Sequence, residues 1–188
     1  MWNLDEQRTM LRDSARSYLG EQQPITVLRK LRDTNDVLGY SPEGWKAFAQ
    51  LGYAGMLVPE AHGGLGLGLT DAALVAEQMG HTLTALPYLS TAVLAATVLK
   101  ASANAALQAQ WLPRIATADT VLAVATEETP RASEAPLATT AERQAQTGGW
   151  VLNGSKQLVI DGAAAEALLV AARDAGAPGG VVWLCVPA

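Results

Sequence analysis

The pattern of apolar residues changes near residue 119, and this change constrains the fold more than any other feature of the sequence. Before it, helix caps and apolar positions at helical spacing recur, as in the Ser41-Pro42 start of a segment that continues through Trp45 and Phe48. After it, short β-type runs such as 121–126 alternate with turns that contain glycine and proline. We therefore predict two domains, an all-helical one over 1–118 and a β domain over 119–188.

The arrangement within each half follows from the same signals. Residues 86–101 carry almost no charge and predict a helix that is buried all round, and Pro113 should bend or end a later helix capped by Asn104. Residues 138–152 predict a hairpin around a Gly-Gly turn. Further strands are predicted at three apolar runs: 158–160, 167–172 and 181–186. Strands do not alternate with helices, so the predicted fold class is α+β, with a partial, antiparallel, barrel-like sheet.

Composition restricts the classes of function. A hydrophobic content of 49% and a mean hydropathy of +0.14 are typical of a globular chain. The net charge of −5 and the scattered cations argue against nucleic-acid binding. No apolar run reaches the roughly 18 residues of a membrane span, and the N-terminus lacks the pattern of a signal peptide, so we expect no membrane partner and a cytoplasmic location. Cys185 is the single cysteine and is interpreted as a core residue.

A glycine-dense segment, residues 58–68 and hereafter the glycine loop, has the look of a nucleotide-binding loop. The P-loop spacing from Gly63 to Gly68 is present, but Leu69 stands where the phosphate-binding lysine must be. The dinucleotide fingerprint fails too, because its last glycine would fall on Leu69 or Asp71. We therefore interpret the glycine loop as a tight connector between helices that binds no phosphate.

No catalytic or metal-binding cluster can be read directly from the sequence. His62 and His81 are the only histidines, and no carboxylates have ligand spacing around them, so no metal site is predicted. Nothing places a glutamate beside a reacting proton, and the four that we considered are interpreted as solvated or capping groups: Glu60, Glu77, Glu127 and Glu128. Two isolated cations, Lys100 and Arg114, are interpreted as helix-end charges rather than a phosphate site.

Four segments, in order along the whole chain, carry a family resemblance. Residues 57–66 resemble the Pro-Glu-x-Tyr/His-Gly-Gly-x-Gly segment of acyl-CoA dehydrogenases, and 111–116 resemble their Tyr-Leu-Pro-x-Leu/Ile-Ala. Residues 125–127 resemble the Thr-Glu-Pro that opens the flavin-binding β domain. Residues 150–156 resemble the Tyr/Trp-x-Leu-Asn-Gly-x-Lys hairpin. Each motif is weak alone, but together they indicate that the chain holds the N-terminal helical domain and part of the middle β domain of this family.

The resemblance implies a cofactor, a reaction and several contacts. The implied activity is FAD-dependent α,β-dehydrogenation of an acyl-CoA thioester, in which the flavin carries the hydride chemistry. Electron-transfer flavoprotein is the implied electron acceptor, and a homologous subunit the implied partner in a homo- or hetero-oligomer. Ala125 and Thr126 would lie at the flavin edge, and Ser133 beside flavin and thioester. Tyr88 falls where the family lines its acyl pocket, although ordinary helix packing explains it equally well.

The departures from the family are as informative as the matches. Leu158 stands where the family places an aromatic residue against the flavin ring, and Ile160 where a threonine reaches the reactive nitrogen. The family's C-terminal helical bundle, which carries the catalytic glutamate, is absent from the 188 residues. We therefore assign no catalytic residue and expect the chain alone to be inactive.

Three hypotheses follow from these departures. The chain is a portion of a catalytic flavoprotein subunit, or it is a non-catalytic partner subunit of a heteromeric enzyme, such as those acting on steroid side chains. The third hypothesis is a flavin oxidase or monooxygenase of the same superfamily.

Overall fold

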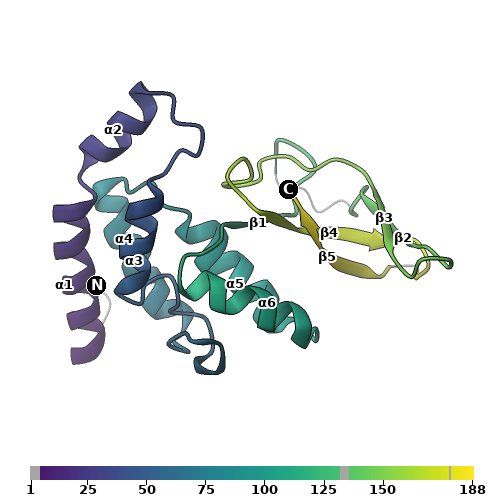
Figure 1. Ribbon diagram of the computed structural model, residues 1–188, viewed down its shortest axis with the longest axis horizontal. Coiled ribbons are helices and arrows are strands. Elements are labelled where there is room, and N and C mark those ends of the chain that lie inside the picture. Colours follow the sequence, from purple (N-terminus) through teal and green to yellow (C-terminus); the bar gives the residue numbers. More distant parts are fainter. Residues whose placement is uncertain (1–4, 132–135, 178) are drawn as a thin grey trace. The chain divides into compact units, whose positions relative to one another are not determined.

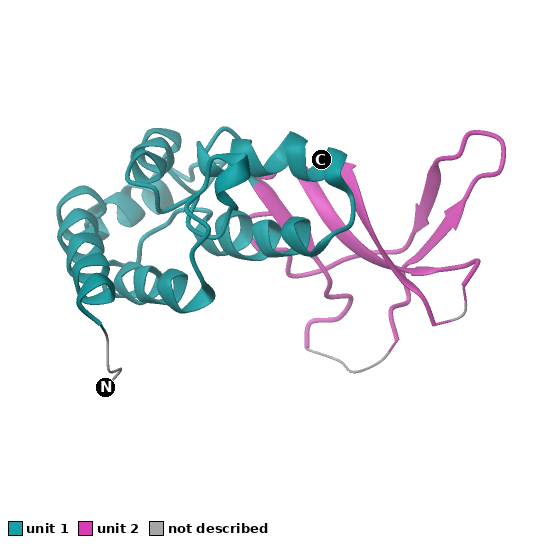
Figure 2. Cartoon of the chain, turned by 90° about the horizontal axis from the view of Figure 1, so that it is seen from below, with its two compact units in different colours: residues 1–121 teal, residues 122–188 magenta. Residues whose placement is uncertain are grey.

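The computed structural model describes residues 5–131, 136–177 and 179–188, and the chain divides into two compact units. The first unit comprises residues 1–121 and is helical, and the second comprises residues 122–188 and is built on a sheet (Figure 2). The predicted fold class, an α+β chain with a helical part followed by a partial β domain, is therefore confirmed.

The helical unit contains six α-helices and two other helical segments among its described residues. They are α1 (Glu6–Gln22), α2 (Ile25–Asp33), α3 (Pro42–Gln50), the 3₁₀ turn η1 (Glu60–His62), α4 (Leu69–Thr82), the π-helix η2 (Tyr88–Ala95), α5 (Ala96–Ala101) and α6 (Ala105–Ala116) (Figure 1). As predicted, the Ser41 hydroxyl accepts from the Gly44 N–H at 3.0 Å to cap α3. The inner side chains of α3 then enter an aromatic core, in which the Phe48 ring meets the Tyr88 ring edge-on.

A buried carboxylate begins α4 and ties it to α1. Asp71 accepts from the Gly68 N–H at 3.1 Å, which caps its own helix, and from the Arg8 guanidinium at 2.8 Å. The hydrogen bond from Arg8 holds the pKa of Asp71 below its ordinary value, against the opposing effect of burial. One side chain therefore fixes both the start of α4 and the helix packed against it.

Two helical expectations need correction. The apolar segment 86–101 begins only at Tyr88, and it starts as a π-helix before it becomes α5. Pro113 does not end its helix, because α6 continues to Ala116. The cost of the missing N–H is met by packing, since Trp111, Leu112 and Ile115 are all buried around the proline. The predicted Asn104 cap is confirmed by its bond from the Leu107 N–H at 3.1 Å.

The glycine loop folds back on the segment that precedes it. The N–H groups of residues 63–67 all donate to carbonyl oxygens between residues 55 and 60. Gly64 is packed so closely that an added Cβ would lie 2.1 Å from the Val58 carbonyl oxygen. Because its amides are already bonded within the chain, the loop offers no ring of free donors to a phosphate. Its glycines serve close backbone approach.

The second unit is built on five strands: β1 (Leu122–Ala125), β2 (Thr140–Arg143), β3 (Trp150–Asn153), β4 (Ala167–Asp174) and β5 (Val181–Pro187). The central strand β4 pairs antiparallel with β5 along its whole length, and β2 and β3 form the predicted hairpin (Figure 1). However, β4 is parallel to β1, in a register that places Leu122 opposite Ala167, and parallel to β2. The sheet is therefore mixed rather than antiparallel, because the long connection from β1 to β4 permits a parallel crossover.

The strand predicted at 158–160 is wrong. Residues 155–165, hereafter the 155–165 loop, contain no strand and close through turns such as the Gly162 N–H to Val159 carbonyl bond of 3.1 Å. Leu158 and Asp161 have positive φ angles of 51° and 56°, which take the backbone out of the extended region. The apolar run was too short to establish a strand against this turn.

Candidate functional site

The end of β1 holds the two residues expected at the edge of a flavin. Ala125 is buried in the sheet, and Thr126 follows it in a half-buried position. The Thr126 hydroxyl donates to the Glu127 carboxylate at 3.3 Å, and its carbonyl oxygen accepts from the Lys156 ammonium at 3.1 Å. The hydroxyl bond is long and only part-buried, so this group can turn to another acceptor, whereas the backbone is held by the bond from Lys156.

Glu128 and Lys156 form an ion pair that the sequence interpretation missed. Their side chains are 15% and 9% exposed, and the Lys156 Nζ donates to the Glu128 carboxylate at 2.8 Å. The same carboxylate accepts from the Ala138 N–H at 2.6 Å and the Thr139 N–H at 2.8 Å. Glu128 is therefore not the solvated group that we expected. No local pattern signals this pair, because its members lie 28 residues apart.

The hydrogen bonds also decide the charge state of Glu128. Burial raises the pKa of this carboxyl, but the bonds from Lys156 and from the Ala138 and Thr139 amides outweigh burial and bring the pKa to about 2. The ordinary value is 4.5. Glu128 is therefore a fixed anion at neutral pH, with no proton to exchange in a reaction.

The structure brings the other two predicted flavin residues to the same place. The Gln157 N–H donates to the Glu127 carbonyl at 2.8 Å, which joins the start of the 155–165 loop to the end of β1. Leu158 and Ile160 follow within that loop and are 66% and 48% exposed. The start of this loop is therefore bonded to the end of β1, and the apolar side chains that follow it are open to solvent.

These residues fit a flat aromatic cofactor such as FAD in part. The Thr126 hydroxyl can hydrogen-bond a ring edge, and the exposed aliphatic groups of Leu158 and Ile160 can cover a ring face. Neither aliphatic side chain can stack as an aromatic ring would, and neither can donate a hydrogen bond. Such a site would hold the cofactor with fewer directed contacts than the family pattern provides.

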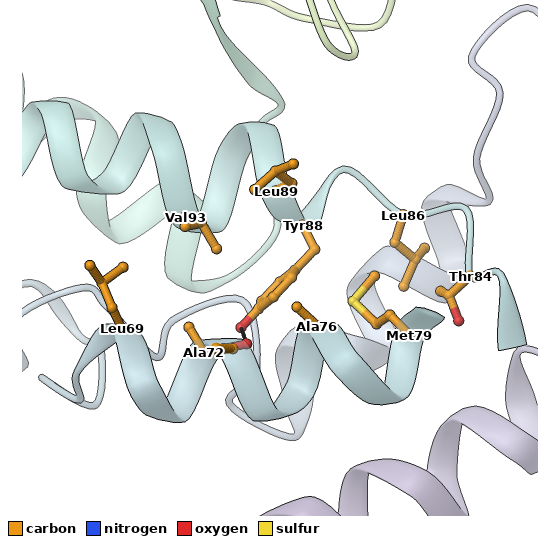
Figure 3. Close-up of a pocket in the computed structure, with 10 residues that line it drawn as sticks. Leu69, Ala72, Ala76, Met79, Thr84, Leu86, Tyr88, Leu89 and Val93 are labelled. Carbon is orange, nitrogen blue, oxygen red and sulfur yellow. Dashed lines mark hydrogen bonds between the residues drawn. The ribbon is translucent and has the colours of Figure 1, made fainter. Parts of the chain in front are cut away.

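A separate pocket lies within the helical unit, between α4 and η2 (Figure 3). It measures about 530 Å³ and is lined by Leu69, Ala72, Ala73, Ala76, Met79, Thr84, Leu86, Tyr88, Leu89 and Val93. Figure 3 shows the Tyr88 side chain reaching from η2 to α4, where its hydroxyl donates to the Ala72 carbonyl at 3.2 Å. Tyr88 is only 2% exposed, and burial raises the pKa of its hydroxyl. Tyr88 therefore contributes an apolar ring wall, with its hydroxyl already bonded.

One further predicted site residue, Ser133, and the two cations that were not assigned to a site, Lys100 and Arg114, remain to be placed. Ser133 lies outside the described residues. Arg114 donates to the Asp119 carbonyl at 3.2 Å and stacks over the Trp111 ring at 5.0 Å, and Lys100 reaches the Leu57 carbonyl at 3.5 Å. Across the described residues, histidine, cysteine, aspartate and glutamate side chains nowhere gather in the threes that a metal ion would need. Within the same residues, no helix is both long and apolar enough to cross a membrane.

Curated relatives match much of the chain. Acyl-CoA dehydrogenase FadE27 of Mycobacterium tuberculosis is 34% identical over 140 residues, which cover 73% of this chain and 36% of that protein. The mitochondrial isovaleryl-CoA dehydrogenase of Arabidopsis thaliana is 30% identical over 131 residues, 69% of this chain and 32% of its own length. The chain therefore spans about a third of the length of these two relatives.

Solved structures match nearly the whole of this chain. A variant of the Tcur3481–Tcur3483 steroid ACAD superposes with a TM-score of 0.84 at 28% identity, over 97% of this chain and 48% of that one. An acyl-CoA dehydrogenase of Bacillus anthracis in complex with FAD gives 0.79 at 25% identity, over 98% and 32%. The ChsE4–ChsE5 complex of Mycobacterium tuberculosis gives 0.81 at 24% identity, over 98% and 48%, and supports the fold alone.

The family model for the acyl-CoA dehydrogenase N-terminal domain matches residues 5–119, a range that includes every helix from α1 to α6. Together with the relatives, this match confirms the resemblance carried by the sequence motifs. The chain belongs to the acyl-CoA dehydrogenase family.

Proposed function

We propose that the chain is part of a flavoprotein whose complete assembly dehydrogenates an acyl-CoA thioester at its α,β bond. The observation that carries the proposal is the meeting of Thr126 with the 155–165 loop in a sheet unit of the family fold. FAD would supply the hydride chemistry. Thr126 would hydrogen-bond its ring edge, with Ala125 small enough to let the ring approach, and Leu158 and Ile160 would pack on it.

The pocket between α4 and η2 supports an acyl substrate. Its volume of about 530 Å³ lies in the range of small-molecule sites, and small side chains such as Ala73 and Ala76 keep it open. We propose that Tyr88 forms a wall for the acyl group. No described residue is assigned as catalytic base, so the full reaction requires residues from the rest of an assembly. Electron-transfer flavoprotein is the proposed acceptor, and the setting is lipid metabolism in the cytoplasm.

Flavin content tests this proposal directly. The chain is purified alone and after co-expression with a homologous acyl-CoA dehydrogenase subunit, and the flavin absorbance per chain is recorded. Bound flavin in either preparation, together with reduction of the flavin by an added acyl-CoA, is the expected result. If both preparations remain colourless with excess FAD, the proposal is wrong.

The substrate pocket is tested by filling it. Ala76→Phe places a ring in the space between α4 and η2 and should weaken acyl-CoA binding to the assembled protein about tenfold or more, as measured by calorimetry. Glu77→Gln, on the same helix but outside this pocket, is the matched control and should bind as the unmodified protein does. If Ala76→Phe binds acyl-CoA as tightly as the unmodified protein, the acyl group does not bind in this pocket.

A second candidate, a non-catalytic partner subunit, is favoured by the exposed Leu158 and Ile160. These side chains provide no ring stacking and no donor. One similar structure, of the steroid ACAD Tcur3481–Tcur3483, is named for two components and supports a heteromeric arrangement by analogy.

Restoring the family residues separates the two candidates. If the chain has lost flavin binding, the double change Leu158→Trp and Ile160→Thr should create flavin absorbance in a preparation that had none. A catalytic subunit should instead hold flavin before the change. Val181→Trp, at an exposed position at the start of β5, controls for added aromatic surface.

A further inference from the structure

The carboxylate of Glu128 joins three parts of the sheet unit that are distant in sequence. One oxygen accepts from Lys156, which follows β3, and from the Thr139 N–H, which precedes β2. The other oxygen accepts from the Ala138 N–H. We call this arrangement the Glu128 clip: the Glu128 carboxylate, Lys156, and the Ala138 and Thr139 amides. It anchors the segment that leaves β1 to the entry of β2 and the exit of β3.

Both charged groups of the clip make several hydrogen bonds, which is the condition for a half-buried ion pair to be tolerated. Removing two charges from water is costly, and their attraction compensates only when the remaining donors and acceptors are also satisfied. Here the carboxylate has three donors, and the Lys156 ammonium finds a second acceptor in the Thr126 carbonyl at 3.1 Å. The pair is therefore a well-ordered, hydrogen-bonded ion pair rather than an exposed surface salt bridge.

The clip also accounts for a departure from the family motif. The chain reads Thr126-Glu127-Glu128 where the family reads Thr-Glu-Pro. A proline would restrict the backbone through its ring but could accept nothing with its side chain. Glu128 instead restrains the same segment through directed bonds to Lys156 and to the two amides. In this chain, tertiary hydrogen bonds of Glu128 therefore restrain the segment after Thr126, in place of the local backbone restraint that a proline would give.

We propose that Glu128 is a positioning residue, which acts through Lys156 to hold Thr126 in the orientation that a flavin requires. The inference rests on the proposed function, because it takes Thr126 as the flavin contact. Thr126 lies between Ala125, which is fixed in β1, and Glu127, whose carbonyl accepts from the Gln157 N–H. Lys156 fixes the Thr126 carbonyl itself. Because its backbone is held on each side, the threonine keeps its Cα and Cβ in place, and its hydroxyl has only a few positions to occupy. This preorganisation strengthens binding.

Two substitutions test the clip. Glu128→Gln keeps the shape but replaces one acceptor oxygen by an amide donor that faces other donors, and Lys156→Met removes the ammonium while keeping the aliphatic stem. Glu142→Gln removes the same charge from an exposed position on β2 and is the matched control. The three variants and the unmodified chain are prepared with the homologous subunit. Hydrogen exchange is then followed at the amides of Ala138, Thr139 and Gln157, and FAD affinity and the flavin absorption spectrum are measured.

The expected result has two parts. Exchange at the Ala138 and Thr139 amides becomes about tenfold faster or more in Glu128→Gln, because their bonds to a charged acceptor are lost. Exchange at the Gln157 amide rises as well, because the segment around its acceptor, the Glu127 carbonyl, is no longer held, while the β4 amides keep their rates. FAD binds about tenfold more weakly in both clip variants, and the flavin bands shift because Thr126 is no longer fixed. Glu142→Gln matches the unmodified protein in every measurement.

Several outcomes would overturn the inference, and they differ from failure of the proposed function. Unchanged exchange at these amides would show that the clip restrains nothing. Faster exchange with unchanged FAD affinity and an unchanged spectrum would reduce Glu128 to a purely structural role. If the unmodified chain binds no flavin with or without its partner, the proposed function fails, and with it the role of Glu128 toward a flavin. The exchange rates then decide separately whether the clip holds the segment.

Discussion

Two irregular segments of this protein, the glycine loop and the 155–165 loop, both use positive φ angles but in opposite ways. In the glycine loop the positive angles fall on Gly63 and Gly66, at 80° and 62°, where the absence of a Cβ makes them inexpensive. In the 155–165 loop they fall on Leu158, which adopts this region at a cost of about 1–2 kcal/mol, and on Asp161, a residue type that tolerates it more readily.

The two loops also differ in how completely their backbones are hydrogen-bonded. Backbone amides 63–67 are all paired with nearby carbonyls, so the glycine loop is self-contained. The 155–165 loop is attached at its start by the Lys156 side chain and one amide, and it exposes Leu158 and Ile160. The comparison teaches that the segment with the nucleotide-loop appearance is structural, whereas the strained, apolar and exposed one is the better binding candidate.

The largest expected effect comes from crowding the glycine loop. Gly64→Ala would place its Cβ 2.1 Å from the Val58 carbonyl oxygen and 2.4 Å from the Val58 Cβ. Because the nearest atoms include backbone, the loop must move, and we expect a loss of at least about 3 kcal/mol in the free energy of unfolding. Urea denaturation measures this loss.

Gly80→Ala is the matched control for crowding. Gly80 lies within α4 with nothing within 4 Å of an added Cβ. The change should stabilise the helix by about 0.5–1 kcal/mol. Equal effects at the two glycines would contradict the close packing of Gly64.

Acid should weaken the attachment of the 155–165 loop through Glu128. Its pKa is lowered from 4.5 to about 2 in the folded chain, so the contribution to stability is complete above about pH 5 and is lost as the pH falls toward 2. The full contribution is up to about 3 kcal/mol by linkage. The difference in unfolding free energy between the unmodified chain and Glu128→Gln should therefore shrink over this range.

The comparison with Glu128→Gln is needed because Asp71 also has a lowered pKa, owing to Arg8, and so adds its own acid sensitivity to the helical unit. Denaturation at pH 7, 5, 4 and 3 in both proteins isolates the Glu128 contribution. A difference that stays constant with pH would show that the carboxylate gains nothing from the clip. The glycine loop, held by backbone bonds, should keep its amide protection throughout.

The smallest effect tests strain at Leu158. Leu158→Asn should raise the free energy of unfolding by roughly 1 kcal/mol, because asparagine adopts the left-handed region more readily and the side chain is already exposed. Thermal denaturation gives the shift. Leu158→Ala, which keeps the Cβ and removes only exposed surface, should show no gain. If alanine stabilises as much as asparagine, relief of backbone strain is not the cause.

The success of the sequence predictions depended on how local the signal was. The Ser41 and Asn104 caps could be predicted because each concerns a side chain and an amide three residues away. The strand at 158–160 could not be judged correctly, because its apolar run gave no sign that Leu158 would turn left-handed. That α6 continues past Pro113 could not be predicted for a related reason, because the burial around the proline comes from tertiary packing.

The candidate site shows the same division. Motif order proposed Thr126, Leu158 and Ile160 as candidates, but Glu128 was interpreted as solvated because nothing near it in sequence is its partner. The pairing with Lys156 exists only once the strands have been assembled in the order β1-β4-β2-β3.

The sequence by itself determined the family, the order of a helical part and a β part, and the residues from which a flavin site would be drawn, since caps, glycine spacing and motifs act over a few residues. Only the tertiary structure decided that the sheet is mixed, that Leu158 is strained and exposed, and that Glu128 is a half-buried, ion-paired anion. The physical reason is that strand pairing, burial and pKa depend on groups brought together from distant parts of the chain.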